Sequence, residues 1–224
     1  MKDSKSTCAR CTIKLSERIC RNPDGKSFPN CPTENTKALL DMSRKQYEKP
    51  AVLNFAKQAS IQEAEGYSHR ELGYDFARPA KPRIVEIIEF SKKMNYKHIG
   101  LAFCAGLVKE AKVVDRLFTS HGLDLTSVIC KVGGVPKETI GLQDHQKIAI
   151  GCFESMCNPI MQARVLNDAK TEFNVLLGLC VGHDSLFLQH AKAPCTVLAV
   201  KDRLLGHNPL AAIYNVDGYY RAIK

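Results

Sequence analysis

The chain has 224 residues, of which 45% are hydrophobic and 25% are charged. These fractions are ordinary for a globular protein, and a chain of this length can bury enough apolar surface to fold without disulfides. No run of about 18 apolar residues is present, so we expect no membrane-spanning helix and no membrane partner. The first residues carry charge but no apolar h-region, so we expect no secretory signal and a cytoplasmic protein.

The chain is basic, with 32 Lys and Arg against 23 Asp and Glu and a formal net charge of +9. Nucleic-acid-binding proteins gather such charge on one face and often interleave it with aromatic residues. Here the positive residues are spread along the chain, so we expect no nucleic acid partner. The expected partner is a small ligand or a redox protein.

Ten cysteines and no tryptophan make the composition unusual. The cytosol keeps thiols reduced, so metal ligation or thiol chemistry is a better interpretation than a disulfide framework. Four of the ten, Cys8, Cys11, Cys20 and Cys31, fall within the first 31 residues. The polar, turn-rich segment between them cannot bury a core of its own, so something else must order it.

The four cysteines have the spacing C-x2-C-x8-C-x10-C. Four thiolates complete a tetrahedral shell for Zn²⁺ or hold the irons of a [4Fe–4S] cluster. Cys8 and Cys11 can reach one metal from a single turn, and Cys20 and Cys31 would close loops onto it. We therefore predict a metal-binding lobe over residues 1–33 and favour zinc over the cluster. The alternative is four unrelated thiols on a flexible arm.

A helical region is predicted next, over residues 34–97. Thr33 can cap a helix from about Glu34 to Glu48, and a second helix starts at Pro50. Residues 66–82 are irregular, and a third helix follows over about 83–95.

Residues 98–224 alternate strand and helix. The expected strands are 99–104, 125–132, 173–180 and 195–200, and the expected helices are 106–120, 158–169 and 184–191, with a last helix from 208. Asn158 and Asp184 are the expected caps of their helices. Near-continuous apolar strands indicate a mainly parallel sheet of about four strands in a doubly wound, Rossmann-like α/β domain. The simplest strand order is second, first, third, fourth, with ligands expected where the direction of winding reverses.

A second group of candidate residues lies where this fold presents side chains to a ligand. Cys104 and Cys180 end two strands, Cys157 precedes a helix start, and His183 follows Cys180. These residues could hold a second metal or cluster. Alternatively, Cys157 or Cys180 is a nucleophile or redox thiol, with His183 as its acid or base.

Two further cysteines, Cys130 and Cys195, are interpreted as core residues of their strands. Four polar residues at helix starts are candidates for ligand binding, since free helix N–H groups attract anions. These four are Asn158, Asp184, His207 and Asn208.

The combination of motifs resembles one family. The motifs are the four amino-terminal cysteines, Cys157-Asn-Pro-Ile-x-Gln162-Ala, Cys180-Val-Gly-His183-Asp184-Ser-Leu-Phe and Lys201-Asp-Arg-x-Leu-Gly-His207-Asn208-Pro209. The family is a cysteine-rich domain of unknown function, found mainly in archaea and anaerobic bacteria and regarded as metal-binding. The resemblance spans nearly the whole chain and implies metal binding through Cys8, Cys11, Cys20 and Cys31. It supplies no reaction.

The sequence thus predicts a metal-binding protein of unassigned activity, with a four-cysteine site and a crevice lined by cysteine and histidine. The alternative is a thiol-dependent redox or transferase enzyme that uses Cys157 or Cys180 with His183. Whether the protein is an enzyme is left open.

Overall fold

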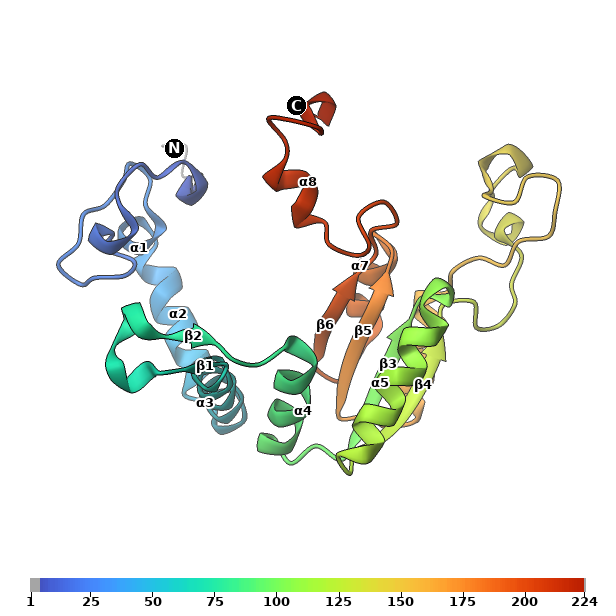
Figure 1. The fold of residues 1–224 in the computed structure, drawn as a ribbon, viewed down its shortest axis with the longest axis horizontal. Helices are drawn as coiled ribbons and strands as arrows, with labels where there is room; N and C mark the ends of the chain where they lie inside the picture. Colours follow the sequence, from blue (N-terminus) through green and yellow to red (C-terminus); the bar gives the residue numbers. More distant parts are fainter. Residues whose placement is uncertain (1–4, 224) are drawn as a thin grey trace. The chain divides into compact units, whose positions relative to one another are not determined.

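The structure is a computed structural model that describes residues 5–223, and it divides into two compact units (Figure 1). The first unit is Met1–Ala64 and the second is Glu65–Lys224. Each is described by itself below. We predicted three regions, with boundaries at residues 33 and 97. The division into two units does not test those boundaries, which stay a prediction.

The first unit consists of turns followed by helices. Two 3-10 turns, Cys8–Arg10 and Leu15–Glu17, precede α1 (Pro32–Asn35), α2 (Lys37–Tyr47) and α3 (Pro50–Glu65). The single helix predicted over 34–48 is wrong in one respect, because Thr36 breaks it into α1 and α2. Thr33 is not the cap either: Cys31 precedes α1, and Pro32 occupies the first helical position.

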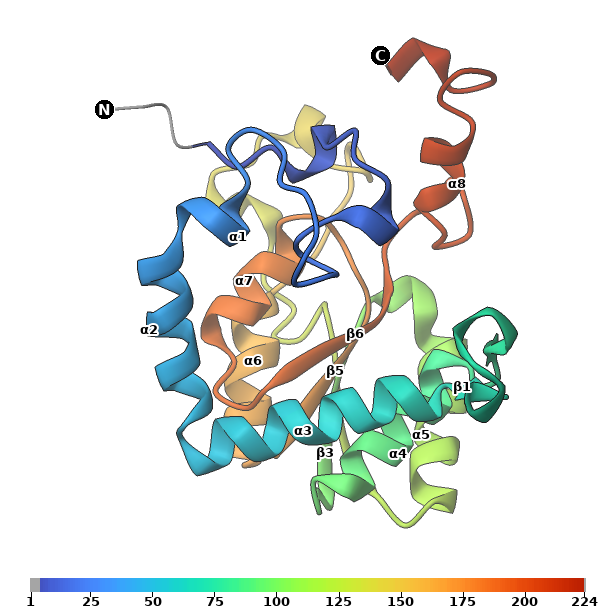
Figure 2. The ribbon, with the colours of Figure 1, turned by 90° about the vertical axis from the view of Figure 1, so that its left-hand side faces the viewer.

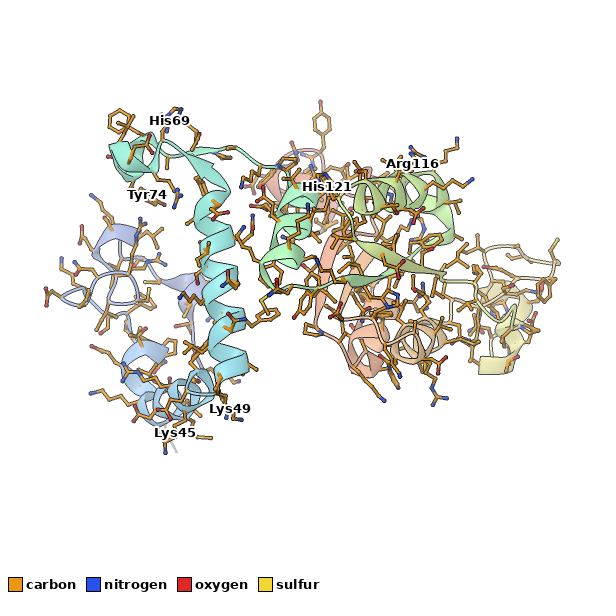
Figure 3. All side chains as sticks on the ribbon, turned by 90° about the horizontal axis from the view of Figure 1, so that it is seen from below. Lys45, Lys49, His69, Tyr74, Arg116 and His121 are labelled. Carbon is orange, nitrogen blue, oxygen red and sulfur yellow. The ribbon has the colours of Figure 1, made fainter. Side chains whose placement is uncertain are left out.

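This unit has almost no core. Among its described residues only Gln62 of α3 is buried, while Leu39, Met42 and Leu53 are exposed. Figure 3 shows Lys45 near the end of α2 and Lys49 just after it. Burial of a large apolar side chain contributes about 1.5–3 kcal/mol to folding, and the first unit gains little stability in this way. The expectation that something besides a core must order residues 8–31 therefore gains weight.

The second unit begins with a short hairpin and a helix. Strands β1 (Tyr67–Ser68) and β2 (Arg78–Pro79) pair antiparallel, and the turn region between them carries His69 and Tyr74, labelled in Figure 3. Helix α4 (Arg83–Lys93) follows. Its Arg83 guanidinium donates to the Val197 carbonyl at 2.6 Å, which ties α4 to the sheet edge.

The sheet has four parallel strands. They are β3 (His98–Phe103), β4 (Asp124–Ile129), β5 (Phe173–Leu179) and β6 (Cys195–Val200), in the order β4-β3-β5-β6. This is the expected order of second, first, third and fourth strand. The winding direction reverses between β3 and β5, as predicted. All seven residues of β5 are buried, as a central parallel strand requires.

The helices that connect these strands are α5 (Val108–Ser120), α6 (Pro159–Asp168) and α7 (His183–His190), and α8 (Leu210–Tyr214) follows β6. Helix α5 packs on β3 and β4, α6 packs on the same two strands, and α7 packs on β5. Figures 2 and 3 show α4 and α5 on one face of the sheet and α6 and α7 on the other. The parallel α/β sheet is confirmed, and the more specific Rossmann-like assignment stays a prediction.

The core lies between the sheet and its helices. Its fully buried large side chains include Phe118 of α5, Leu166 of α6 and Phe187 of α7. The carboxyl end of β5 departs from regular pairing at Gly178, whose φ is +68°. A Cβ at that position would lie 2.2 Å from Leu107, so only glycine lets this end of the sheet close.

The connection over residues 133–157 leaves the sheet and returns to it through a closed neck. Met156 N–H donates to the Val135 carbonyl at 2.8 Å, and Lys137 N–H donates to the Glu154 carbonyl at 3.0 Å. Lys137 Nζ also lies 2.6 Å from Glu154 Oε1. These contacts fix Cys157 beside the sheet independently of what lies further out.

The outer part of the same loop is organised by one lysine. Lys147 Nζ lies 2.8 Å from a carboxylate oxygen of Glu138 and of Asp144, and it donates to the Cys152 carbonyl at 2.6 Å. Its side chain is only 4% exposed. The hydrogen bonds with Asp144 and Glu138 raise the pKa of Lys147, so this buried cation stays charged.

Candidate functional site

The four amino-terminal cysteines meet at one place. Cys8, Cys11, Cys20 and Cys31 all line a single cavity of about 50 Å³ in the first unit. A water molecule needs roughly 10–15 Å³ of such volume, so the cavity is large enough to hold a metal ion. All four residues are free thiols.

Local backbone geometry brings them there. The Cys8–Cys11 pair forms the expected tight turn, closed by Cys11 N–H donating to the Cys8 carbonyl at 3.2 Å. Arg18 donates to the carbonyls of Cys11 and Ile13, each at 2.8 Å, and so holds the stretch of chain that leaves this turn. Gly25 lies so close to the backbone of Arg18 that a Cβ would sit 2.5 Å from it.

The side chains do not form a coordination shell. Over residues 5–223 no three or more His, Cys, Asp or Glu side chains come together as a group that could hold a metal ion. The cysteines therefore share a cavity without being gathered around a point. A four-thiolate shell would require the sulfurs to approach one ion at about 2.3 Å each.

In the second unit, the carboxyl edge of the sheet brings three thiols together. Cys104 directly follows β3, Cys130 directly follows β4, and Cys157 directly precedes the cap of α6. Cys104 and Cys157 both pack against the core cluster that contains Cys130, and the Cys130 side chain lowers the pKa of each. Asn158 N–H donates to the Cys130 carbonyl at 2.7 Å, which places Cys157 against the end of β4.

Charge at this edge favours two of the three thiolates. The Cys130 hydrogen bond, the Gly106 N–H and Lys201 lower the pKa of Cys104 to about 5. The Cys130 hydrogen bond, Lys131 and His183 lower the pKa of Cys157 to about 6. An ordinary cysteine has a pKa of about 8.5, so both thiols ionise more readily than an ordinary cysteine.

Cys130 behaves in the opposite way. Its hydrogen bonds to Cys104 and Cys157, together with burial, raise the pKa of its thiol strongly. Its side chain also accepts a hydrogen bond from Ala105 N–H at 3.2 Å. The interpretation of Cys130 as merely a core residue is incomplete: it is 3% exposed, but it is also the residue that joins the three thiols.

The other cysteine interpreted as a core residue fits that description. Cys195 begins β6, its Sγ donates to the Ala193 carbonyl at 3.3 Å, and burial raises the pKa of its thiol. Its side chain also accepts from the Asn174 amide at 3.9 Å. These contacts lie at the start of β6, away from the carboxyl edge of the sheet, so we leave Cys195 in the core.

The predicted residues Cys180 and His183 flank this site. Arg203 Nη2 donates to Cys180 Sγ at 3.1 Å. His183 opens α7, and its N–H donates to the Cys180 carbonyl at 3.0 Å. A metal held by Cys104, Cys157, Cys180 and His183 stays a prediction.

Two buried polar atoms near the same edge have no hydrogen-bond partner among the described residues, namely His183 Nδ1 and Gln162 Oε1. The Gln162 amide donates to the carbonyls of Phe103 and Val128, at 3.2 and 2.8 Å, and so clamps the ends of β3 and β4. An unpaired buried polar atom costs about 1–3 kcal/mol, and such atoms often face a ligand or water. This gives the Gln162 motif a structural role that its sequence did not reveal.

The helix-start residues divide into caps and turn formers. Asn158 caps α6 as predicted, since its Oδ1 accepts from Met161 N–H at 3.1 Å. The prediction that Asp184 caps α7 is wrong. The cap lies two residues earlier, at Gly182, which has a φ of +84°, and Asp184 lies in the first turn of the helix. Glycine reaches this left-handed conformation without the strain that other residues meet.

His207 closes a turn, since its Nδ1 accepts from Asp202 N–H at 3.1 Å. The carbonyl of the adjacent Asn208 accepts from Ala211 N–H at 3.1 Å. Ligand binding by Asn158, Asp184, His207 and Asn208 stays a prediction. No helix in the described residues is long and apolar enough to cross a membrane.

Fold and site together define an α/β protein with a cysteine-lined cavity in one unit and a thiol cluster in the other. Residues 31–198 match the family described as "Protein of unknown function (DUF1847)". The chain is also 42% identical over 207 residues to "Uncharacterized protein MJ0455" of Methanocaldococcus jannaschii, an alignment covering 92% of this chain and 93% of that relative. The chain therefore belongs to the DUF1847 family. Neither description names a metal, and the metal binding implied by the resemblance stays a prediction.

Proposed function

We propose that this protein binds one metal centre through Cys8, Cys11, Cys20 and Cys31. The observation that carries the proposal is that these four thiols, spread over 24 residues of chain, line one small cavity. Thiolates are the preferred ligands of zinc and of iron–sulfur clusters. The donor set therefore fits the group.

The metal's contribution would be structural. Four protein ligands leave no open coordination position, which is the arrangement of closed zinc sites. In small zinc peptides, binding contributes about 10 kcal/mol or more to folding. The first unit needs a contribution of this kind, because Gln62 is the one buried residue among those described there. Arg18, which donates to the Cys11 carbonyl, would be fixed together with the metal loop.

We favour zinc, with a [4Fe–4S] cluster as the alternative. Metal and acid-labile sulfide content, with an absorption spectrum, of protein purified without oxygen decides between them. About one zinc per chain without sulfide supports the closed site. About four irons and four sulfides with a broad visible band support the cluster. A chain that retains neither overturns the proposal.

A second candidate function is favoured by the thiol cluster. We propose that the second unit carries thiol-dependent redox or transferase chemistry, with Cys157 as a reactive thiolate and His183 beside it. Two features support Cys157: the Cys130 side chain, Lys131 and His183 lower the pKa of its thiol to about 6, and the buried His183 Nδ1 atom lacks a hydrogen-bond partner within residues 5–223. One thiol alkylated far faster than the exposed Cys152 at pH 6 supports this function, and equal, slow alkylation of all accessible thiols overturns it.

A further inference from the structure

The backbone register aligns two cysteines on neighbouring strands. Phe103 of β3 pairs with Ile129 of β4, and Cys104 and Cys130 each follow by one residue. The Cys130 N–H donates to the Phe103 carbonyl at 2.8 Å, so the ladder continues to this position. Adjacent strands lie about 4.8 Å apart, within the Cα separation of about 4.4–6.8 Å found in disulfides. The register therefore places the two cysteines side by side at the ends of neighbouring strands.

Their surroundings are unequal. Cys104 is partly exposed and faces the Gly106 N–H and the Lys201 ammonium, which stabilise a thiolate. Cys130 is buried and protonated. An incoming molecule can thus reach Cys104 but not Cys130, which is the arrangement of an attacking thiolate and a resolving thiol.

The third thiol, Cys157, can act as the base that this pair of cysteines requires. Cys130 must lose its proton before it can attack, and burial opposes that loss. Cys157 lies beside Cys130, because the adjacent Asn158 N–H donates to the Cys130 carbonyl at 2.7 Å, and Lys131 and His183 favour its ionised form. It can accept the Cys130 proton directly, and the transferred proton leaves the number of negative charges in the cluster unchanged.

We propose that Cys104 and Cys130 form a redox-active dithiol that exchanges with small disulfides, with Cys157 as the proton acceptor. This rests on the thiol chemistry proposed for the second unit but assigns the attack to Cys104 and makes the Cys157 thiolate its proton acceptor, and it is independent of the metal centre of the first unit.

The reaction takes two steps. The Cys104 thiolate attacks one sulfur of a disulfide R–S–S–R, forming a Cys104–S–S–R mixed disulfide and releasing R–S⁻. Cys130 passes its proton to Cys157 and attacks Cys104 Sγ, forming the Cys104–Cys130 disulfide and releasing the second R–S⁻. The two protein thiols lose two electrons and the substrate disulfide gains them.

The environment also sets the preferred direction. Hydrogen bonds and Lys201 stabilise the reduced form, in which Cys104 is a thiolate. A dithiol whose reduced form is stabilised makes an oxidising disulfide. We therefore expect the oxidised site to transfer its disulfide readily to a partner dithiol.

The test traps the intermediate. The full-length protein is treated with bis(2-hydroxyethyl) disulfide at pH 6.5 and digested with trypsin, and the peptides are weighed. Cys104 and Cys130 fall on separate peptides, His98–Lys109 and Leu117–Lys131. We expect the two peptides to be linked by a disulfide in the wild type. In Cys130→Ser, we expect a stable mixed disulfide on Cys104 instead.

Two further variants sharpen the result. In Cys157→Ser the mixed disulfide should form at its usual rate but resolve about 100-fold more slowly, the scale of a lost general base. Cys152→Ser, which alters an exposed thiol of the outer loop, should match the wild type.

Two outcomes would overturn the inference in different ways. If Cys104 reacts fast but the wild type never links it to Cys130, the dithiol is refuted while a reactive thiol remains. If no thiol of the second unit reacts faster than Cys152, the thiol chemistry fails as a whole. Folding of each variant is checked by circular dichroism, and the wild-type linkage does not depend on any variant.

Discussion

The Lys201 ammonium should set the pH range over which Cys104 reacts. Wild-type Cys104 has a pKa of about 5 and should therefore be alkylated along a curve with its midpoint near that pH. Lys201→Gln removes a charged hydrogen bond to the thiolate. Hydrogen bonds to charged groups contribute about 1.5–3 kcal/mol, and 1.36 kcal/mol corresponds to roughly one pKa unit. Because Cys104 is partly exposed, solvent screening reduces this, and we expect an upward shift of about one unit.

The assay is the rate of iodoacetamide labelling from pH 4 to 9, read on the peptide that carries Cys104. Lys112→Gln changes the net charge equally at an exposed position of α5 and should leave the curve in place. At pH 5.5 the Lys201 variant should react several-fold more slowly than the wild type. A midpoint that stays near pH 5 in the variant would refute the assigned role of Lys201. A wild-type midpoint near the ordinary ~8.5 would refute the stabilised thiolate itself.

The same shift has a consequence for stability whose sign follows from the pKa. The pKa of Cys104 is lower in the folded chain than in the unfolded one, so its stabilising contribution is present above about pH 8.5. That contribution is lost as the pH falls toward about 5. Cys130, whose pKa is raised, contributes with the opposite sign and loses its contribution as the pH rises.

Three other outcomes are expected. Cys11→Ser should release the metal and increase proteolysis of residues 8–31, whereas Cys180→Ser should keep both metal and fold; retained metal stoichiometry in Cys11→Ser would contradict the four-cysteine site. Asn158→Ala removes the cap of α6 and should lower the free energy of unfolding by about 1 kcal/mol, read as a lower urea midpoint at constant slope. Hydrogen bonds from Ala149 and Ile148 and the Lys137 ammonium lower the pKa of Glu154 to about 2, so Glu154→Gln should speed amide exchange within residues 137–154 at neutral pH. In the wild type the same loosening should appear only as the pH falls from about 4 toward 2, and exchange that is unchanged in the variant would exclude this role.

Much of the second unit could be predicted because hydrophobic runs and turn residues act locally. Strand β6 was predicted with its observed bounds, Cys195–Val200, and Asn158-Pro159 marked the start of α6. The strand order was predicted from the handedness of crossovers together with an analogy to doubly wound folds, and the structure has this order. The helix predicted over 34–48 was broken because Thr36 takes a non-helical conformation and its hydroxyl donates to the Pro32 carbonyl at 2.6 Å.

The site was harder to predict, because its central residue looks ordinary in sequence. Cys130 ends an apolar strand, where cysteine is usually a small hydrophobe. Its importance depends on the register between β3 and β4, which places it beside Cys104, and no local pattern specifies a register. The available signal was that three strands, β3, β4 and β5, each end in an apolar residue followed by cysteine. Once the strand order is known, cysteines that follow neighbouring strands can be recognised as residues that lie close together.

The closed neck at Val135 and Met156 separates the part of the loop that positions Cys157 from the outer part of the same loop. The chain leaves the sheet and returns to it within hydrogen-bonding distance of its own exit, so the neck and the Asn158 hydrogen bond to Cys130 together set the position of Cys157. Residues 138–153 lie beyond the neck contacts. This segment could be exchanged for a short β-turn, or for a foreign domain with adjacent termini, without displacing the thiols at its base.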